Sequence, residues 1–455
     1  MPGGGFAGPA FLGGETEHMI RRSSGRSGKG IIRRVTAVCL LILLAAGLSS
    51  CGNGSRQGRV YWLNYKPEID ATLQKLARRY REETGVEVRV ITAASGTYAQ
   101  TLLAEMDKSA PPTLFVLSNT ADVAMWKDYA MDLAGTPIAG ELTTDAYNLY
   151  DESGKLAAIG YCYECYGIIV NPALVEASGH SMEELTGFDG LKAVAEDIHS
   201  RAGELGFDAF TSSDMDSSSS WRFTGHMVNL EYVYEERAAG TIWKECPPAI
   251  SGAYLDYYRK LFSLCINNST VLPHQLATGG HDAQQEFISG KAAFYINGSW
   301  EYDAISKAVP GAVMIPYYCG MEGEENAGLN CGTSNYWAIN ASVSEADRQA
   351  TMDFVMWLAT DPEASAEMVR EVGVMPFRQA APSRNGFLKN AEEYTARGCY
   401  VMDWATNFQP NTDQYRAGLV SALIQYCADQ SDENWEAFRS AFVDGWAIQY
   451  AAIQP

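Results

Sequence analysis

The segment 294–302 (FYINGSWEY) holds the side chains best suited to binding chemistry. A strand-like run leads into Asn297 and Gly298, a pair typical of turns, and Trp300 and Tyr302 follow closely. A sugar offers an apolar C–H face, which an aromatic ring can cover, and hydroxyl groups, which an amide such as Asn297 can bind. Because a single tryptophan after a turn is more often a packing residue, the segment by itself indicates only a candidate carbohydrate site.

Sequence motifs typical of catalytic or metal sites are weaker than this binding pattern. No HExxH or GxSxG pattern occurs in the sequence, and no GxGxxG pattern occurs after the N-terminal 50 residues. Cys162 and Cys165 have metal or redox spacing, but no second pair accompanies them, which favours buried structural cysteines. We therefore expect no metal, no cofactor and no enzymatic activity. The 55 acidic residues nevertheless offer many carboxylate pairs, so a surface glycoside hydrolase stays an alternative.

The order of strand-like and helical patterns around these residues predicts an α/β protein. Strand-like runs at 60–64, 86–92 and 113–118 alternate with helical patterns, and this order indicates a parallel sheet with crossover helices. Ligands of such sheets bind beyond the carboxyl ends of the strands, which makes Asn64, Ser95 and Asn119 candidate site residues. A second region begins with a strand near 167–171 and is mostly helical to about 290.

The N-terminal 50 residues have the layout of a secretory signal peptide. Arg33 and Arg34 precede an apolar run at 35–48, which is shorter than the roughly 20 residues of a membrane-spanning helix. Met19, followed by basic residues, is a better start for such a signal than Met1. The sequence LSSC at 48–51 resembles the lipobox of bacterial lipoproteins, which implies cleavage before Cys51, a lipid on its sulfur and a tether at 51–58.

Composition narrows the choice of partners. The formal net charge of −21 should repel nucleic acid and anionic membranes, so neither is expected as a direct partner. The length of 455 residues exceeds what one compact core usually holds, so two lobes are expected. The cysteines permit disulfides in an exported protein, but the sequence assigns no pair.

Several ordered segments together resemble the bacterial extracellular solute-binding proteins, the maltose-binding-like lipoproteins of carbohydrate ABC transporters. The segment ISGKAAFYINGSW at 288–300 is similar to their GKAAM…NGxW segment, and residues 64–102 are similar to their opening strand–helix–strand. YGIIVNPALVEASG at 166–179, NYWAIN at 335–340 and VGVMPF at 372–377 follow in the family's order. One departure is 183–197, which lacks the family's usual P.TW.E pattern.

This resemblance implies a two-lobe α/β fold with a hinge and a cleft between the lobes (type II-like). Crossings between lobes are expected near 163–166, 335–339 and 399–404. Lobe one would then be 59–164 plus 338–400, and lobe two 165–336 plus 401–455. Carried over by position, the resemblance and the strand ends give the candidate ligand contacts Trp300, Asn297, Tyr302, Glu164, Tyr166, Asn64, Ser95, Asn119, Trp221, Arg222, Ser334, Asn335 and Trp404.

The function that the resemblance implies is capture of a sugar or oligosaccharide outside the cell and its delivery to the permease of an ABC importer. The protein is expected to be a monomer on the outer face of the cell membrane, held there by the lipid on Cys51 alone. A non-sugar solute, such as a polyamine, an osmolyte or a peptide, is the main alternative among binding proteins. A receptor or scaffold lipoprotein without a small ligand is another.

Overall fold

The computed structural model describes residues 57–94, 96–216 and 219–453. Contacts within the chain group Arg56–Pro455 into one unit. The predicted signal segment, Cys51 and Ser95 lie outside the described residues. Within the described part of the chain, no helix combines the length and the apolar character needed to cross a membrane.

The first lobe is built on a six-stranded sheet with the order β2-β1-β3-β11-β5-β4. Its strands are β1 (Val60–Asn64), β2 (Val88–Thr92), β3 (Leu114–Leu117), β4 (Asn148–Tyr150), β5 (Leu156–Gly160) and β11 (Tyr336–Ile339). Its helices are η1 (Pro67–Ile69), α2 (Asp70–Thr84), α3 (Tyr98–Met106), α4 (Thr120–Trp126), α5 (Pro137–Glu141), α13 (Glu345–Thr360) and α14 (Pro362–Val372). β1 pairs in parallel with β2 and β3, which confirms the predicted parallel arrangement of these three strands with crossover helices. The rest of the sheet is antiparallel, since β11 pairs antiparallel with β3 and β5, and β4 with β5.

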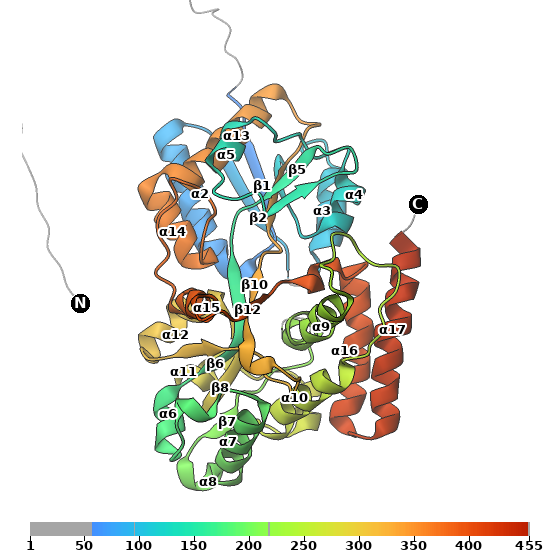
Figure 1. The fold of residues 1–455 in the computed structure, drawn as a ribbon. Helices are drawn as coiled ribbons and strands as arrows, with labels where there is room; N and C mark the ends of the chain where they lie inside the picture. Colours follow the sequence, from blue (N-terminus) through green and yellow to red (C-terminus); the bar gives the residue numbers. More distant parts are fainter. Residues whose placement is uncertain (1–56, 95, 217–218, 454–455) are drawn as a thin grey trace, which may run out of the picture. The chain divides into compact units, whose positions relative to one another are not determined.

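Burial explains why these residues form these elements. All five residues of β1 are buried, as expected for a central strand covered on both faces. The helical stripe of α2 (Leu73, Leu76 and Tyr80) is also buried. Figure 1 shows α14, in orange, close to α2, in blue, and contacts between the two helices join segments far apart in the sequence.

The second lobe is built on a mixed sheet with the order β12-β10-β6-β8-β7, and β9 also pairs with β6. Its strands are β6 (Glu164–Val170), β7 (Asp208–Phe210), β8 (Ala292–Gly298), β9 (Val313–Ile315), β10 (Ala327–Gly332) and β12 (Tyr400–Met402). Its longer helices are α6 (Pro172–Ala177), α7 (Phe188–Ser200), α9 (Asn229–Ala239), α10 (Leu255–Asn267), α11 (Ala283–Ile288), α12 (Tyr302–Ala308), α15 (Gly386–Ala396), α16 (Thr412–Ala428) and α17 (Asp432–Ile453).

Short helical segments complete this lobe. They are η2 (Met182–Glu184), α8 (Ala202–Leu205), the π-helix η3 (Arg222–Met227), η4 (Pro273–Ala277), η5 (Ser299–Glu301), η6 (Glu324–Asn326) and η7 (Ala405–Phe408). The aromatic stripe of α17, which runs from Trp435 to Trp446, is buried in the core of this lobe, as its helical spacing predicts.

The connections between the two sheets are hydrogen-bonded to one another. The first runs from β5 to β6 and the second from β10 to β11. The amide of Tyr161 in the first donates to the carbonyl of Asn335 in the second at 3.2 Å. Tyr163 exchanges two backbone hydrogen bonds with Val374, at 2.7 and 3.3 Å. Gly373 has a φ of 82° here, and a Cβ atom on it would lie 2.9 Å from the carbonyl oxygen of Tyr163.

The third connection lies earlier in the chain than the sequence indicates. Phe377 packs in the core of the first lobe, whereas Phe387 and Leu388 of α15 pack with Cys165 and Leu329 of the second. The strand β12 then pairs with β10. The passage therefore falls between 377 and 385 rather than near 399–404, because the apolar face of α15 is buried on the second sheet.

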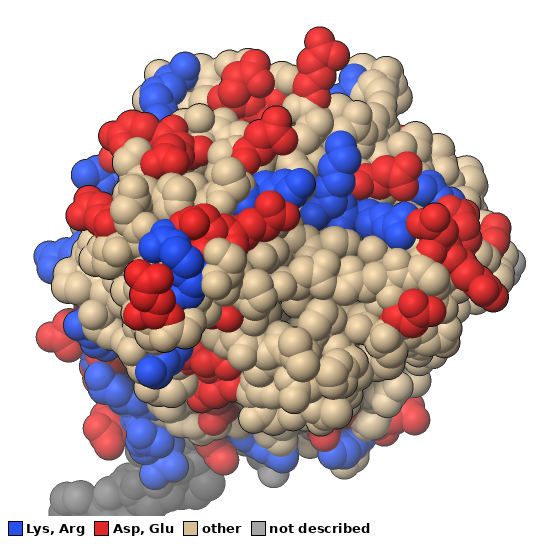
Figure 2. Space-filling model, turned by 90° about the horizontal axis from the view of Figure 1, so that it is seen from below, with Lys and Arg blue, Asp and Glu red and all other residues tan. Residues whose placement is uncertain are grey.

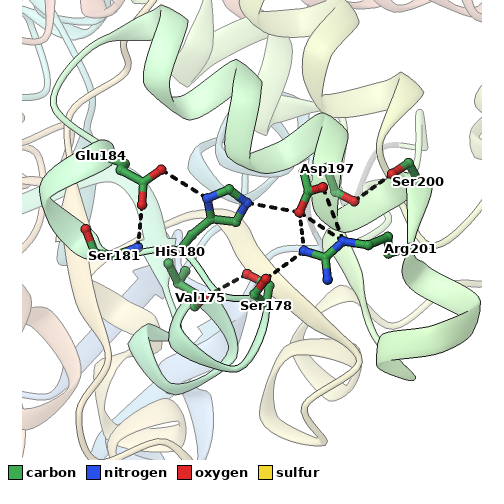
Figure 3. A network of polar contacts seen from close by, with 8 residues as sticks. All are labelled: Val175, Ser178, His180, Ser181, Glu184, Asp197, Ser200 and Arg201. Carbon is green, nitrogen blue, oxygen red and sulfur yellow. Dashed lines mark hydrogen bonds and ion pairs between the residues drawn. The ribbon is translucent and has the colours of Figure 1, made fainter.

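A polar network joins α6 to α7 in the second lobe (Figure 3). The imidazole of His180 lies 3.0 Å from both Glu184 Oε2 and Asp197 Oδ2. Arg201 also bonds to Asp197 and donates to the carbonyl of Ser178 at 2.6 Å. This histidine thus stabilises a corner of the fold.

Charges of both signs are interspersed on the face of the molecule drawn in Figure 2. The net negative charge is therefore not gathered into a single acidic patch on that face. Such a mixture of signs is typical of a solvated surface.

Candidate functional site

Two glycines let tryptophan rings lie directly on strand backbones. β8 ends at Gly298, and Trp300 follows in η5. A Cβ atom at Gly298 would overlap the indole of Trp300, and one at Gly332 would lie 2.8 Å from Cγ of Trp404. Neither ring could keep its position over a larger residue, so the turn signal at 297–298 also has a packing cause.

Four aromatic side chains gather around the imidazole of His226, and we call these five residues the aromatic cluster: Tyr166, Trp221, His226, Trp300 and Trp404. Tyr166 stacks on the imidazole with ring centroids 4.1 Å apart and planes at 4°. Trp221, Trp300 and Trp404 follow at 4.9, 5.3 and 6.0 Å. Tyr166 and Trp404 are buried, whereas the other three rings are partly exposed.

The cluster is assembled from four places in the second lobe. Tyr166 lies on β6, Trp300 in η5, and Trp404 just after β12. The π-helix η3 and its N-cap residue supply the other two, because i→i+5 hydrogen bonding brings positions five apart, such as Trp221 and His226, onto one face. The sequence predicted the four aromatic residues as site residues but missed His226, since an isolated histidine has no pattern of its own.

Buried polar atoms in and beside the cluster have no hydrogen-bond partner among the described residues. They are Tyr166 Oη, His226 Nδ1, Trp404 Nε1 and Arg222 Nε. An unpartnered buried polar group costs about 1–3 kcal/mol, so several in one place indicate a site that hydrogen-bonds a ligand. Burial and the charges of Arg416, Arg222 and Lys66 hold the pKa of His226 well below its usual range, so the imidazole is neutral.

Asn297 is a buried residue that holds the end of β8 next to the cluster. It is fully buried, and its amide nitrogen donates to Tyr295 Oη and, at 3.0 Å, to Glu301 Oε1. Its amide oxygen accepts from the backbone of Gly298 at 2.9 Å. These bonds occupy both ends of the amide, which is the arrangement of a positioning residue. Glu301, which the sequence did not single out, has its pKa raised by burial.

Tyr302 does not join the cluster. Its ring packs edge-on against Phe387, with centroids 5.1 Å apart, and lies over Gly386. The two-residue step from Trp300 to Tyr302 enters helix α12, which turns the tyrosine toward the core beneath α15.

Lys66 is a residue of the first lobe that lies next to the cluster. It follows β1, and its ammonium lies 2.6 Å from Glu164 Oε1 and 5.7 Å from the centre of the Trp300 ring. Burial disfavours the charge of Lys66, but Glu164 and Glu68 raise its pKa above the usual value. The predicted Asn64 holds this turn, because its side chain bonds to both the amide and the carbonyl of Lys66.

The other predicted residues of the first lobe and the connections have different surroundings. Asn119 caps α4, and its side-chain oxygen accepts from the amide of Asp122 at 2.9 Å. Burial raises the pKa of Asp122 to about 6. Asn335 is buried in the second connection, and its side-chain oxygen has no partner among the described residues. Its neighbour Ser334 is partly exposed.

A separate groove of about 1200 Å³ lies on the second lobe, between η2, α10 and η6, and most of its charged lining residues are acidic. Its buried carboxylate, Glu324, already accepts from the amides of Phe188, Cys319 and Gly320 at 2.6–2.7 Å. Since its buried polar group is satisfied, this groove makes a weaker candidate site than the aromatic cluster.

Comparison with known proteins decides the family. Residues 75–396 match the family described as bacterial extracellular solute-binding protein. The chain belongs to this family. The match spans most of the chain and includes residues of both sheets, so this solute-binding protein shares the family's two-lobe α/β fold.

Solved structures have the same fold at low sequence identity. RafE in complex with raffinose has a TM-score of 0.67 and 16% identity, covering 86% of this chain and 99% of its own. The ABC substrate-binding protein Lmo0181 from Listeria monocytogenes, in complex with cycloalternan, has a TM-score of 0.63 and 14% identity, covering 87% and 99%. UgpB from Mycobacterium tuberculosis, in complex with glycerophosphocholine, has a TM-score of 0.62 and 15% identity, covering 87% and 98%.

The family membership sets the class of function. The protein is a solute-binding protein of the ABC-transporter type, and the family and the similar structures are binding proteins rather than enzymes. The aromatic cluster and the Lys66–Glu164 pair are therefore its candidate solute site.

Proposed function

We propose that the protein is a lipid-anchored, extracellular substrate-binding protein that captures a sugar or oligosaccharide and delivers it to the permease of an ABC importer. The aromatic cluster with its unpartnered polar atoms carries this proposal. Its partly exposed rings, Trp221 and Trp300, offer faces for the apolar side of a sugar. Tyr166 Oη, His226 Nδ1 and Trp404 Nε1 offer hydrogen bonds for hydroxyl groups.

Capture by closure requires contacts from both lobes, because a ligand shifts an equilibrium only through its different affinities for the two states. Lys66 of the first lobe reaches Trp300 of the second, so the two lobes already meet at the cluster. A solute that bridges them would favour a hinge closure of the kind found in binding proteins.

The proposed anchor rests on the lipobox-like sequence at 48–51, and the proposed permease partner rests on the family. A lipid on Cys51 would hold the monomeric protein at the outer face of the membrane, within reach of a permease. Radiolabelled palmitate incorporated into the full chain, but not into its Cys51→Ala variant, would support this part. Equal labelling of the two would contradict it.

A binding experiment tests the central part. Purified protein is screened against mono- and oligosaccharides by thermal shift, and the sugars are then examined by chromatography. We expect saturable stabilisation by at least one sugar, which is recovered unchanged. Breakdown of the sugar would favour a glycoside hydrolase, and a flat response would point to a non-sugar solute or to a lipoprotein without a small ligand.

The variant Trp300→Ala then locates the site. We expect its affinity for the identified sugar to fall at least about tenfold, or about 1.4 kcal/mol, since it loses a stacking face. Trp357→Ala is the matched control, because Trp357 stacks on Tyr80 and Phe354 in the first lobe. Unchanged affinity in Trp300→Ala would remove this residue from the site.

A further inference from the structure

Arg222 is a buried cation beside the aromatic cluster without a carboxylate at ion-pair distance among the described residues. Only 8% of the residue is exposed. Its guanidinium lies 4.5 Å from the centre of the Trp221 ring and donates at long range to Ser219 O (3.4 Å) and Tyr295 Oη (3.3 Å). Its Nε has no partner among the described residues. A buried guanidinium with unused donors indicates that an acceptor is supplied from outside the chain.

Arg416 approaches the same π-helix from α16. Its Nε donates to Gln409 at 2.6 Å. A Cβ atom on Gly225, which directly precedes His226, would lie 2.8 Å from Cζ and 3.0 Å from both terminal nitrogens of Arg416. Among the described residues, these two nitrogens have no hydrogen bond and no ion pair. Both guanidinium groups, together with Lys66, also lower the pKa of His226, so all three cations act on the centre of the cluster.

The carboxylates near the cluster are already engaged or lie farther away. Glu164 is paired with Lys66, and Glu301 accepts from Asn297 and Gln284. Arg222 favours the charged form of Glu301 through space, and Arg416 does the same for Asp413, but neither pair reaches ion-pair distance. The two arginines thus keep free donors, whereas Glu164 and Glu301 have used their acceptors. Asp403, whose charge acts on Tyr166, forms no ion pair with either arginine among the described residues.

We propose that the solute carries an acid group, a carboxylate or a phosphate, which Arg222 and Arg416 bind while the aromatic cluster holds the rest of the molecule. This inference rests on the proposed function, since it takes the aromatic cluster as the binding site. Planar guanidinium groups match the geometry of both acid groups, and each such hydrogen bond is charge-assisted.

Calorimetry with matched pairs of sugars tests the proposal on the purified protein. Galacturonate is compared with galactose, trigalacturonate with galactotriose, and glucose 6-phosphate with glucose, so that carboxylate and phosphate are distinguished. We expect one acidic sugar to bind about tenfold tighter than its neutral partner or better. Its affinity, unlike that of the neutral partner, should weaken as salt is raised.

Variants connect this preference to the two arginines. Arg222→Gln and Arg416→Gln should each weaken binding of the acidic sugar about tenfold, and Arg416→Lys, which keeps the charge, should weaken it less. Arg397→Gln is the control, since that exposed guanidinium stacks on Tyr394 at 4.3 Å, outside the cluster, and its affinity should stay within about twofold.

Three outcomes would overturn the inference, and they have different consequences for the function. Neutral sugars that bind as tightly as their acidic partners would overturn it and leave the proposed capture of sugar standing. Glutamine variants that bind the acidic sugar normally would do the same. If no sugar of either kind bound, both the acid-group inference and the proposed sugar ligand would fall.

Discussion

Replacing Lys66 by methionine removes the cation that lies 2.6 Å from Glu164 and leaves this carboxylate buried. The side chains of the pair are only 5% and 2% exposed. Removal of one partner from a buried pair costs about 3–5 kcal/mol, mainly because the remaining charge is uncompensated. For Arg56–Pro455, the entropy of unfolding is about 0.8 kcal/mol per degree, so we expect the melting temperature to fall by about 4–6 °C.

Differential scanning calorimetry on three variants measures this effect. The double variant Lys66→Met/Glu164→Met should recover to within about 2 °C of the parent, since an apolar pair can replace a buried ion pair at little cost. Lys75→Met is the matched control, because it breaks an ion pair of the same 2.6 Å length whose lysine side chain is 61% exposed. We expect its melting temperature to change by less than about 1 °C.

The pH dependence gives the reasoning an independent check. Burial raises the pKa of Glu164, and loss of Lys66 removes the main charge that opposes this rise. In Lys66→Met the carboxyl is therefore protonated at mildly acidic pH, so the deficit should be smaller at pH 5 than at pH 8. A fall in melting temperature no larger than that of Lys75→Met, or a double variant no more stable than the single, would refute the argument.

Three further predictions concern residues with contrasting roles. Gly332→Ala should weaken solute binding about tenfold by displacing the Trp404 ring, which equilibrium titration would measure, whereas unchanged affinity would show that the ring is not needed. Asn119→Ala should lower the free energy of unfolding by about 1 kcal/mol through loss of a helix cap and leave affinity within about twofold; a large loss of affinity would make Asn119 a ligand contact instead. Although burial opposes it, hydrogen bonds to Glu184 and Asp197 raise the pKa of His180, so its contribution is present below its unfolded pKa and lost as pH rises through the folded value. His180→Gln should therefore cost up to about 1 kcal/mol in urea unfolding at pH 5.5 and almost nothing at pH 9, and an equal cost at both values would contradict the charged network.

Local patterns predicted the parts of the fold that depend on local chemistry. The alternation of strands and helices before 130 and the stripe of α17 could be read from the spacing of apolar residues. The position of the third connection could not, because it depends on which of two sheets buries the apolar face of α15. Both sheets are apolar, so the choice is made by packing of α15 against β6, β9 and β10, which are not its neighbours in the sequence.

Some site residues could be predicted from local patterns, and others depend on tertiary packing. Aromatic residues near turns and strand ends were predicted, because ring stacking needs particular residue types. The asparagines at strand ends have side chains that bond to nearby backbone, as Asn64 and Asn119 do, since a short amide satisfies local groups before distant ones. Lys66, His226 and Arg416 were missed, because single cationic or titratable residues resemble solvated surface positions until their neighbours are known.

Backbone hydrogen bonds join the first two connecting segments to each other and to residue Val374, which lies just before the third connection. The bond between Tyr161 and Asn335 and the two between Tyr163 and Val374 join three stretches of backbone into one narrow ribbon. Sliding or twisting one lobe against the other would shear these bonds, whereas bending across the ribbon would preserve them. A hinge closure would thus have nearly one degree of freedom, so that few other arrangements would compete with the closed one, and little orientational entropy would be lost as the lobes came together.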